Sequence, residues 1–242
     1  MGESKPVRLV LASASLGRRV LLERTGIPFE IMPADIPEPE TGFSDPRTMV
    51  QTISWLKAAA VAPRVDQGLV LAADTIGWIN GHPVLKAADE ADARRILREL
   101  AGKVHELWTG VTLWRRPDDM QIVWQERSRV NFAGMTDAAL EEYLATRSWR
   151  GHSGAYAIKE SDDPYVRIVE GNLTNVIGLP MESLGRVLES GFATHVYKQY
   201  PADWRKVVEM FRDSEFMREV DEECQRLRDA EREAAERGEP QP

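Results

Sequence analysis

The sequence has little that would indicate a secreted, membrane or disulfide-stabilised protein. Its 242 residues include a single cysteine, Cys224, which excludes an internal disulfide and a thiolate metal cluster. No apolar run is long enough to span a membrane, and the N-terminal residues lack the apolar core of a signal peptide. We therefore expect a cytoplasmic protein with no membrane partner.

The sequence also lacks an excess of positive charge, with 31 lysines and arginines against 39 aspartates and glutamates. The net charge is −8, and from Asp213 onward eleven acidic residues stand against five arginines, a balance of −6 that leaves about −2 for the rest. A nearly neutral body has no basic field for a nucleic acid polymer, so we expect none as a partner.

Several catalytic signatures are missing as well. There is no G-x-S-x-G elbow, no P-loop and no dinucleotide glycine fingerprint. The histidines show no metal-ligand spacing and are interpreted as structural or surface residues: His82, His105, His152 and His195. The chemistry must therefore rest on other side chains.

The sequence does contain alternating strand and helix patterns. The predicted strands are 9–12, 27–32, 69–73, 105–114, 121–132 and 165–170, with a hairpin at 76–85. The predicted helices are 17–24, 46–62, 89–100, 136–146 and 181–189. This alternation predicts an α/β fold with a mixed sheet in one domain, 1–192. Charged residues at helical spacing predict a C-terminal helical extension over 193–242.

The stretch LVLASASLGRRVLL, residues 9–22, is the most informative part of the chain. It has the pattern of a buried strand, a serine turn and a helix with two arginines in its first turn. Helix N-termini carry partial positive charge, so cations there are favoured when an anion such as phosphate binds. Ser13, Ser15, Arg18 and Arg19 fit such a site. In the alternative interpretation, Ser15 is an ordinary N-cap and the two arginines are solvated surface residues. These residues alone leave both interpretations open.

Asp74 follows an apolar strand, where open α/β sheets place ligands, although a carboxylate there is as often a turn or helix cap. Lys57 and Lys86 are candidate phosphate partners, but most single lysines are surface residues. Glu38, in a proline-rich loop, is a candidate magnesium ligand beside Asp74, since one or two carboxylates plus substrate phosphates commonly hold a divalent ion.

Four blocks in this order resemble the Maf-like nucleoside triphosphate pyrophosphatases. They are LASAS with Arg18; AADT with Lys86; the segment ARRIL through LAG to WTGV; and GAYAI with EGN and NVIGLP. The resemblance covers about residues 7–188. It implies a two-lobed fold of the inosine-triphosphatase-like type, a cleft between the lobes, a homodimer, a divalent cation (Mg²⁺ or Mn²⁺), and hydrolysis of a nucleoside triphosphate to monophosphate and pyrophosphate.

The resemblance also implies roles for particular residues. The family's functional positions fall on Ser13, Ser15, Arg18, Glu38, Lys57, Asp74 and Lys86. Asp74 would orient or deprotonate the attacking water or hold the metal together with Glu38, while the cationic residues neutralise the leaving pyrophosphate. The sequence leaves base and metal ligand open for Asp74.

Three positions set expectations about the nucleobase. In the branch acting on dTTP and UTP, arginine, threonine and glutamine usually stand where this chain has Gly17, Thr75 and Lys159; the branch acting on 7-methyl-GTP has tryptophan, glutamine and glutamate. This chain fits neither set, so the sequence leaves open whether the substrate is a modified nucleotide. We expect Gly17 to remove a large side chain from the pocket. The alternatives are a catalytically weakened nucleotide-binding regulator of the same fold, and an unrelated phosphate-binding protein or phosphatase.

Overall fold

The computed structural model describes residues 8–156, 164–193, 226, 229–230 and 237. Its strands are β1 (Leu9–Leu11), β2 (Phe29–Ile31), β3 (Gly68–Ile79), β4 (His82–Val84), β5 (Lys103–Arg116), β6 (Gln121–Phe132) and β7 (Val166–Glu170). They form one seven-stranded sheet in the order β2-β1-β3-β5-β6-β7, with β4 also paired to β3. The β2-β1-β3 pairs are parallel and the remaining pairs antiparallel, which confirms the mixed α/β sheet.

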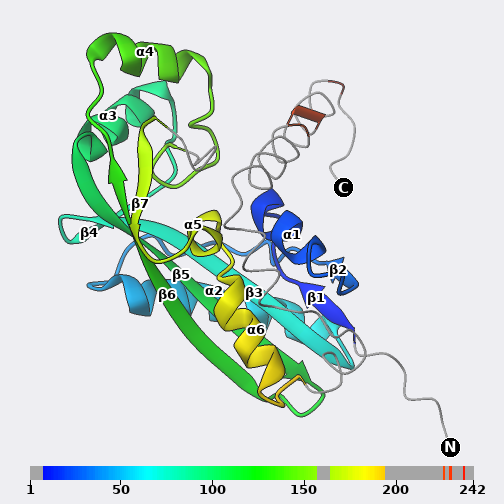
Figure 1. The fold of residues 1–242 in the computed structure, drawn as a ribbon. Helices are drawn as coiled ribbons and strands as arrows, with labels where there is room; N and C mark the ends of the chain where they lie inside the picture. Colours follow the sequence, from blue (N-terminus) through cyan, green and yellow to red (C-terminus); the bar gives the residue numbers. More distant parts are fainter. Residues whose placement is uncertain (1–7, 157–163, 194–225, 227–228, 231–236, 238–242) are drawn as a thin grey trace, which may run out of the picture.

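Helices cover both faces of this sheet (Figure 1). They are α1 (Leu16–Glu23), α2 (Pro46–Val61), α3 (Glu90–Leu100), α4 (Asp137–Ala145), α5 (Leu173–Ile177) and α6 (Met181–Glu189), with a 3-10 turn at Ala62–Arg64. Leu69 and Leu71 of β3 pack in the core that contains α1 and α6, whereas Val70 and Ala72 pack in the core that contains α2. Because strand side chains alternate between faces, odd-numbered residues of this part of β3 face α1 and even-numbered residues face α2.

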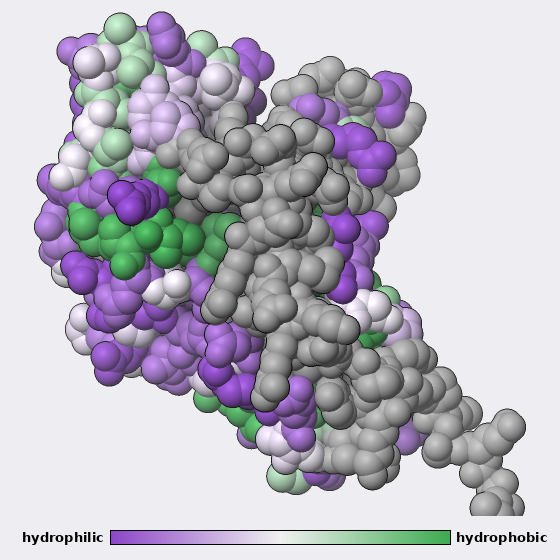
Figure 2. All heavy atoms as spheres, in the orientation of Figure 1, coloured by the Kyte–Doolittle hydropathy of each residue, from purple (hydrophilic) through white to green (hydrophobic). Residues whose placement is uncertain are grey.

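A second lobe is built on the far ends of the long strands. There, α3 and α4 pack with β5, β6 and β7 around a separate hydrophobic cluster that includes Leu97, Phe132 and Leu140. Figure 1 shows this lobe above the first, with β3, β5 and β6 running between them. Figure 2 shows a mostly hydrophilic described surface with an apolar band at the level where the two lobes meet.

The predicted local signals hold for most elements. Ser15, Asp89 and Thr136 cap α1, α3 and α4 with their side-chain oxygens, as N-cap residues do. The five-residue helix α5 was not predicted, because so short a helix has no periodicity to detect. The expected C-terminal extension lies outside the described residues, apart from 193, 226, 229–230 and 237. Among the described residues no helix is long and apolar enough to cross a membrane.

Candidate active site

The sheet is interrupted along one edge of β3. One edge pairs with β5 continuously from Gly68 to Trp78. On the other edge β1 pairs with 69–71 and β4 with 77–79, so residues 72–76 lie between these two neighbours. We call this interval the sheet gap; it contains Asp74 and Thr75. The prediction that the strand ends before Asp74 is wrong, because pairing with β5 carries β3 onward, and it is β1 that ends here.

Asp74 faces α2, in a cluster with one lysine and a second carboxylate. Lys57 Nζ, on α2, lies 2.7 Å from Asp74 Oδ1 and 2.9 Å from Glu38 Oε1. Asp74 and Lys57 are buried, whereas about half of the Glu38 side chain is exposed. The second Asp74 oxygen, Oδ2, is also buried and has no hydrogen-bond partner among the described residues. The structure thus brings together Glu38, Lys57 and Asp74, three of the candidate residues from the sequence.

The close approach of α2 to the sheet depends on a glycine. Gly110 of β5 lies opposite Asp74 in the strand register. A Cβ at Gly110 would lie 2.2 Å from the carbonyl oxygen of Val50, in the backbone of α2. Only glycine therefore lets α2 lie this close to the sheet, and Lys57 is carried two helical turns beyond Val50. The prediction of site residues from the sequence missed Gly110.

Arg18 of α1 is buried on the opposite face of the sheet, held by three neutral acceptors. Its Nε donates to the Gly178 carbonyl at 2.8 Å, Nη1 to Ser13 Oγ at 3.1 Å, and Nη2 to Thr75 Oγ1 at 3.1 Å. Burial lowers the pKa of Arg18 from its ordinary value, and the charges of Asp74 and Glu38 oppose that effect. The solvated interpretation is therefore wrong for Arg18.

The charge of Arg18 is not neutralised by direct contact. Among the described residues no carboxylate forms an ion pair with it. Described residues accept from three of its five N–H groups, which leaves one on Nη1 and one on Nη2 without an acceptor in this part of the chain. A buried cation with neutral partners and donors to spare favours an anionic ligand.

The other residues of the serine turn have structural contacts. Ser15 caps α1, its Oγ accepting from the Arg18 backbone N–H at 3.5 Å, so the N-cap interpretation is confirmed for Ser15. The Ser15 N–H in turn donates to Ser13 Oγ at 3.2 Å. Arg19 is part-exposed and pairs with Glu23 at 2.8 Å. Ser13 and Arg18, rather than Arg19, are thus the polar pair at the sheet gap.

Thr75 faces α1 and joins Arg18 to α5. Its Oγ1 lies 2.9 Å from Thr109 Oγ1, and Thr109 Oγ1 donates to the Asn175 carbonyl at 2.9 Å. Gly178, just after α5, has a φ of 122°, and a Cβ there would lie 3.2 Å from both Arg18 Nε and Thr75 Oγ1. Thr109 and Gly178 were not singled out as site residues, although both lie in the blocks that carry the family resemblance.

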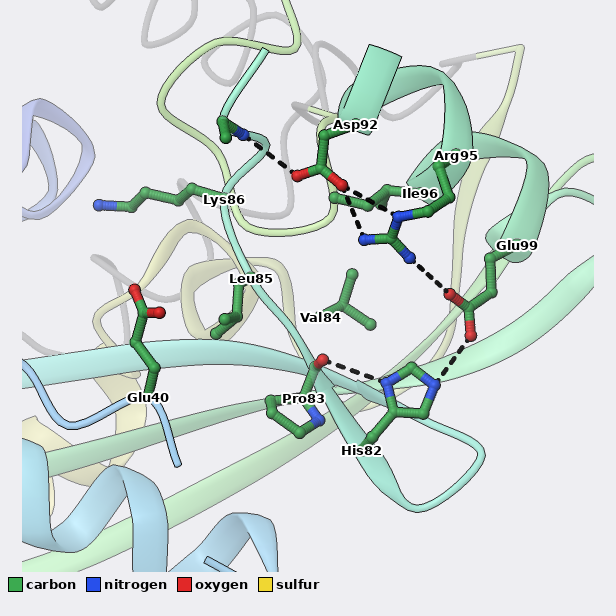
Figure 3. Close-up of a pocket in the computed structure, with 11 residues that line it drawn as sticks. Glu40, His82, Pro83, Val84, Leu85, Lys86, Asp92, Arg95, Ile96 and Glu99 are labelled. Atoms are coloured by element: carbon green, nitrogen blue, oxygen red, sulfur yellow. Dashed lines mark hydrogen bonds and ion pairs between the residues drawn. The ribbon is translucent and has the colours of Figure 1, made fainter. Parts of the chain in front are cut away.

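Lys86 is exposed and follows β4. Its backbone pairs with Ser153, whose Oγ lies 3.5 Å from the Thr75 carbonyl oxygen, so this segment borders the sheet gap. Beside it is a hollow of about 330 Å³, walled by the ion pairs of Asp92, Arg95 and Glu99 (Figure 3). Figure 3 shows the Lys86 side chain extending away from that wall. The described contacts bring its backbone to the sheet gap but give its ammonium no partner there.

The base-related positions differ in what the structure shows. A Cβ on Gly17 would lie 2.9 Å from Ile177 Cγ2 and 3.3 Å from the Ile177 carbonyl oxygen. The end of α5 therefore packs against Gly17, and the expectation that Gly17 removes a large side chain from the pocket stays a prediction. Lys159 lies outside the described residues, and Thr75 has the contacts given above.

No group of three histidine, cysteine, aspartate or glutamate side chains that could hold a metal occurs in the described parts of the chain. His105 is buried, and burial lowers its pKa to about 4. Its Nε2 lies 2.5 Å from the Tyr156 hydroxyl. The structural interpretation of this histidine agrees with that burial.

The family described as "Maf-like protein" matches residues 8–191. The chain belongs to the Maf-like family. A relative in Rhodopirellula baltica, named dTTP/UTP pyrophosphatase, is 38% identical over 192 residues, covering 78% of this chain and 84% of the relative. One of the same name in Pelotomaculum thermopropionicum is 37% identical over 181 residues, covering 75% and 95%. The solved structure of the Staphylococcus aureus Ham1 protein overlaps with a TM-score of 0.40 at 19% identity, covering 52% of this chain and 72% of that one, too little to bear on the fold.

Proposed function

We propose that this protein is a nucleoside triphosphate pyrophosphatase, which hydrolyses a nucleoside triphosphate to the monophosphate and pyrophosphate. The observation that carries the proposal is the buried Arg18 guanidinium, held only by neutral acceptors among the described residues, at the same sheet gap as the buried Asp74 carboxylate. The Arg18 guanidinium suits binding of a phosphate, and the Asp74 carboxylate suits activation of a water molecule. The pyrophosphatase names of the Maf-like relatives support this reading.

The reaction follows from the contacts of Asp74. Lys57 occupies Oδ1, which leaves Oδ2 to accept a proton from a water molecule. That water attacks the α-phosphorus in line, its oxygen bonds to phosphorus, and the bond from the α-phosphorus to the bridging oxygen breaks. The electron pair leaves with pyrophosphate, whose growing charge Arg18 and Lys86 offset.

A divalent cation fits the same cluster. Asp74 and Glu38 both contact the Lys57 ammonium group, so two carboxylates already converge on one cationic position. We propose that these two carboxylates, with phosphate oxygens, hold Mg²⁺ or Mn²⁺ when substrate binds. The bound cation would supply charge stabilisation to the phosphates.

We also propose that the protein is a homodimer. The proposal is based on two exposed apolar side chains, Val104 and Val169. They lie on the face of β5 and β7 opposite the hydrophobic cluster that these strands form with α3 and α4. Light scattering on the full chain checks this: a mass of twice 27.3 kDa supports the dimer, and a monomer at micromolar concentration contradicts it.

A panel of triphosphates tests the activity. The full chain is incubated with Mg²⁺ or Mn²⁺ and with dTTP, UTP, the purine triphosphates and modified triphosphates such as 7-methyl-GTP, and pyrophosphate release is measured. Asp74→Asn should lower turnover by at least a hundredfold, while Asp66→Asn, at an exposed carboxylate, should leave it unchanged. Thermal stabilisation by triphosphate without any product would instead indicate the nucleotide-binding regulator, and release of orthophosphate would indicate a phosphatase.

A further inference from the structure

The hydroxyl protons around Arg18 can be assigned from the acceptors alone. The Asn175 carbonyl can only accept, so the single hydroxyl proton of Thr109 goes to it over 2.9 Å. Thr109 Oγ1 must then accept from Thr75, whose hydroxyl lies 2.9 Å away. The guanidinium of Arg18 can only donate, so Thr75 Oγ1 accepts from Nη2 at 3.1 Å. The result is one directed chain from Arg18 through Thr75 and Thr109 to the backbone of α5.

This direction limits what Thr75 can do for a substrate. Its only proton is committed to Thr109, so it has none to donate to a nucleobase carbonyl. One lone pair of its oxygen accepts from Arg18, and a hydrogen bond from a charged donor is stronger than one between neutral groups. Gly178 holds Nε of the same guanidinium through its backbone carbonyl oxygen.

We propose that Thr75 and Thr109 are positioning residues that act on the triphosphate through Arg18, and that Thr75 does not donate a hydrogen bond to the base. The inference rests on the proposed function for its substrate class. It deepens that function by assigning these two threonines to phosphate binding.

Inorganic tripolyphosphate is the decisive probe, because it carries the phosphates without any base. Its binding to the full chain is measured by calorimetry for wild type, Thr75→Val, Thr75→Ser and Thr109→Val. Loss of one hydrogen bond to a charged group should weaken binding by roughly tenfold to a hundredfold in Thr75→Val. Thr109→Val should weaken it by a few-fold, and Thr75→Ser should restore binding to within about threefold of wild type.

Thr112→Val is the matched control. Thr112 is a buried threonine of the same strand β5, but its hydroxyl contacts Ser54 of α2 at 3.0 Å rather than the Arg18 chain. This variant removes the same hydroxyl from the same strand and should leave tripolyphosphate binding unchanged. Thermal unfolding of every variant confirms that each is folded.

Hydrolysis then separates the two proposals. Thr75→Val should lower kcat/KM for pyrimidine and purine triphosphates by the same factor. A change in the ratio between bases, or unaltered tripolyphosphate binding in folded Thr75→Val, overturns the positioning role, as does wild-type protein that fails to bind tripolyphosphate. If wild type binds tripolyphosphate but releases no pyrophosphate from any triphosphate, the proposed function fails while the calorimetry still decides the roles of Thr75 and Thr109.

Discussion

Replacing Lys57 with methionine should be the most destabilising single change at the Asp74 cluster. Lys57 contacts both carboxylates through its ammonium, and the three charges sum to −1. Methionine keeps the apolar length of the side chain but leaves two negative charges, one of them on a buried carboxylate without its partner. Removing one partner of a buried pair costs about 3–5 kcal/mol in the free energy of unfolding.

The neighbouring changes should cost less, for reasons visible in the same contacts. Asp74→Asn leaves Lys57 paired with Glu38, so about 1–2 kcal/mol is expected. Glu38→Gln removes a half-exposed partner and should cost at most about 1 kcal/mol. The order of destabilisation is therefore Lys57→Met, then Asp74→Asn, then Glu38→Gln.

Urea unfolding of ligand-free protein at pH 7 measures these differences. Lys103→Met, at an exposed lysine, serves as control and should change stability by less than about 0.5 kcal/mol. The double variant Lys57→Met with Asp74→Leu should recover part of the loss, because both charges of the buried ion pair are then gone. If Lys57→Met costs less than about 1 kcal/mol, the buried ion pair does not stabilise the fold in the way described.

Three further changes probe other parts of the structure. Gly110→Ala should destabilise the protein by about 1–3 kcal/mol and lower turnover by displacing α2, whereas Gly134→Ala, which meets no atom within 4 Å, should do neither in parallel urea and turnover assays. The free energy of unfolding should fall as the pH drops from 6.5 to about 4, because in this range His105 is protonated in the unfolded chain but stays neutral in the folded protein. The loss should reach about 3 kcal/mol and should be absent from His105→Gln when unfolding is followed across that range. Arg18→Lys should weaken tripolyphosphate binding at least tenfold in calorimetry, since an ammonium cannot serve three acceptors in the plane of a guanidinium; equal affinity would contradict the anion site.

Local patterns in the sequence were sufficient for most elements and for the principal charged residues. Alternation and helical spacing predicted the long strands and α2, and the strand-turn-helix stretch singled out Ser13 and Arg18. The sheet gap was not predictable, because it arises from where β1 and β4 end relative to β3, a non-local arrangement. The contacts of Thr109 and Gly178 were also not predicted, because a hydroxyl and a backbone carbonyl leave no charge pattern in a sequence.

The bond between Arg18 Nε and the Gly178 carbonyl has a consequence for how the protein is made. It joins residues 160 positions apart, so α1 is synthesised long before the group that holds its arginine exists. Contacts of such separation close late, because a long loop must first be ordered. A nascent chain that ends before α5 has β1, β3 and Asp74 but lacks one of the three acceptors that hold the guanidinium. The proposed anion site is therefore completed only when nearly the whole matched region has left the ribosome and folded.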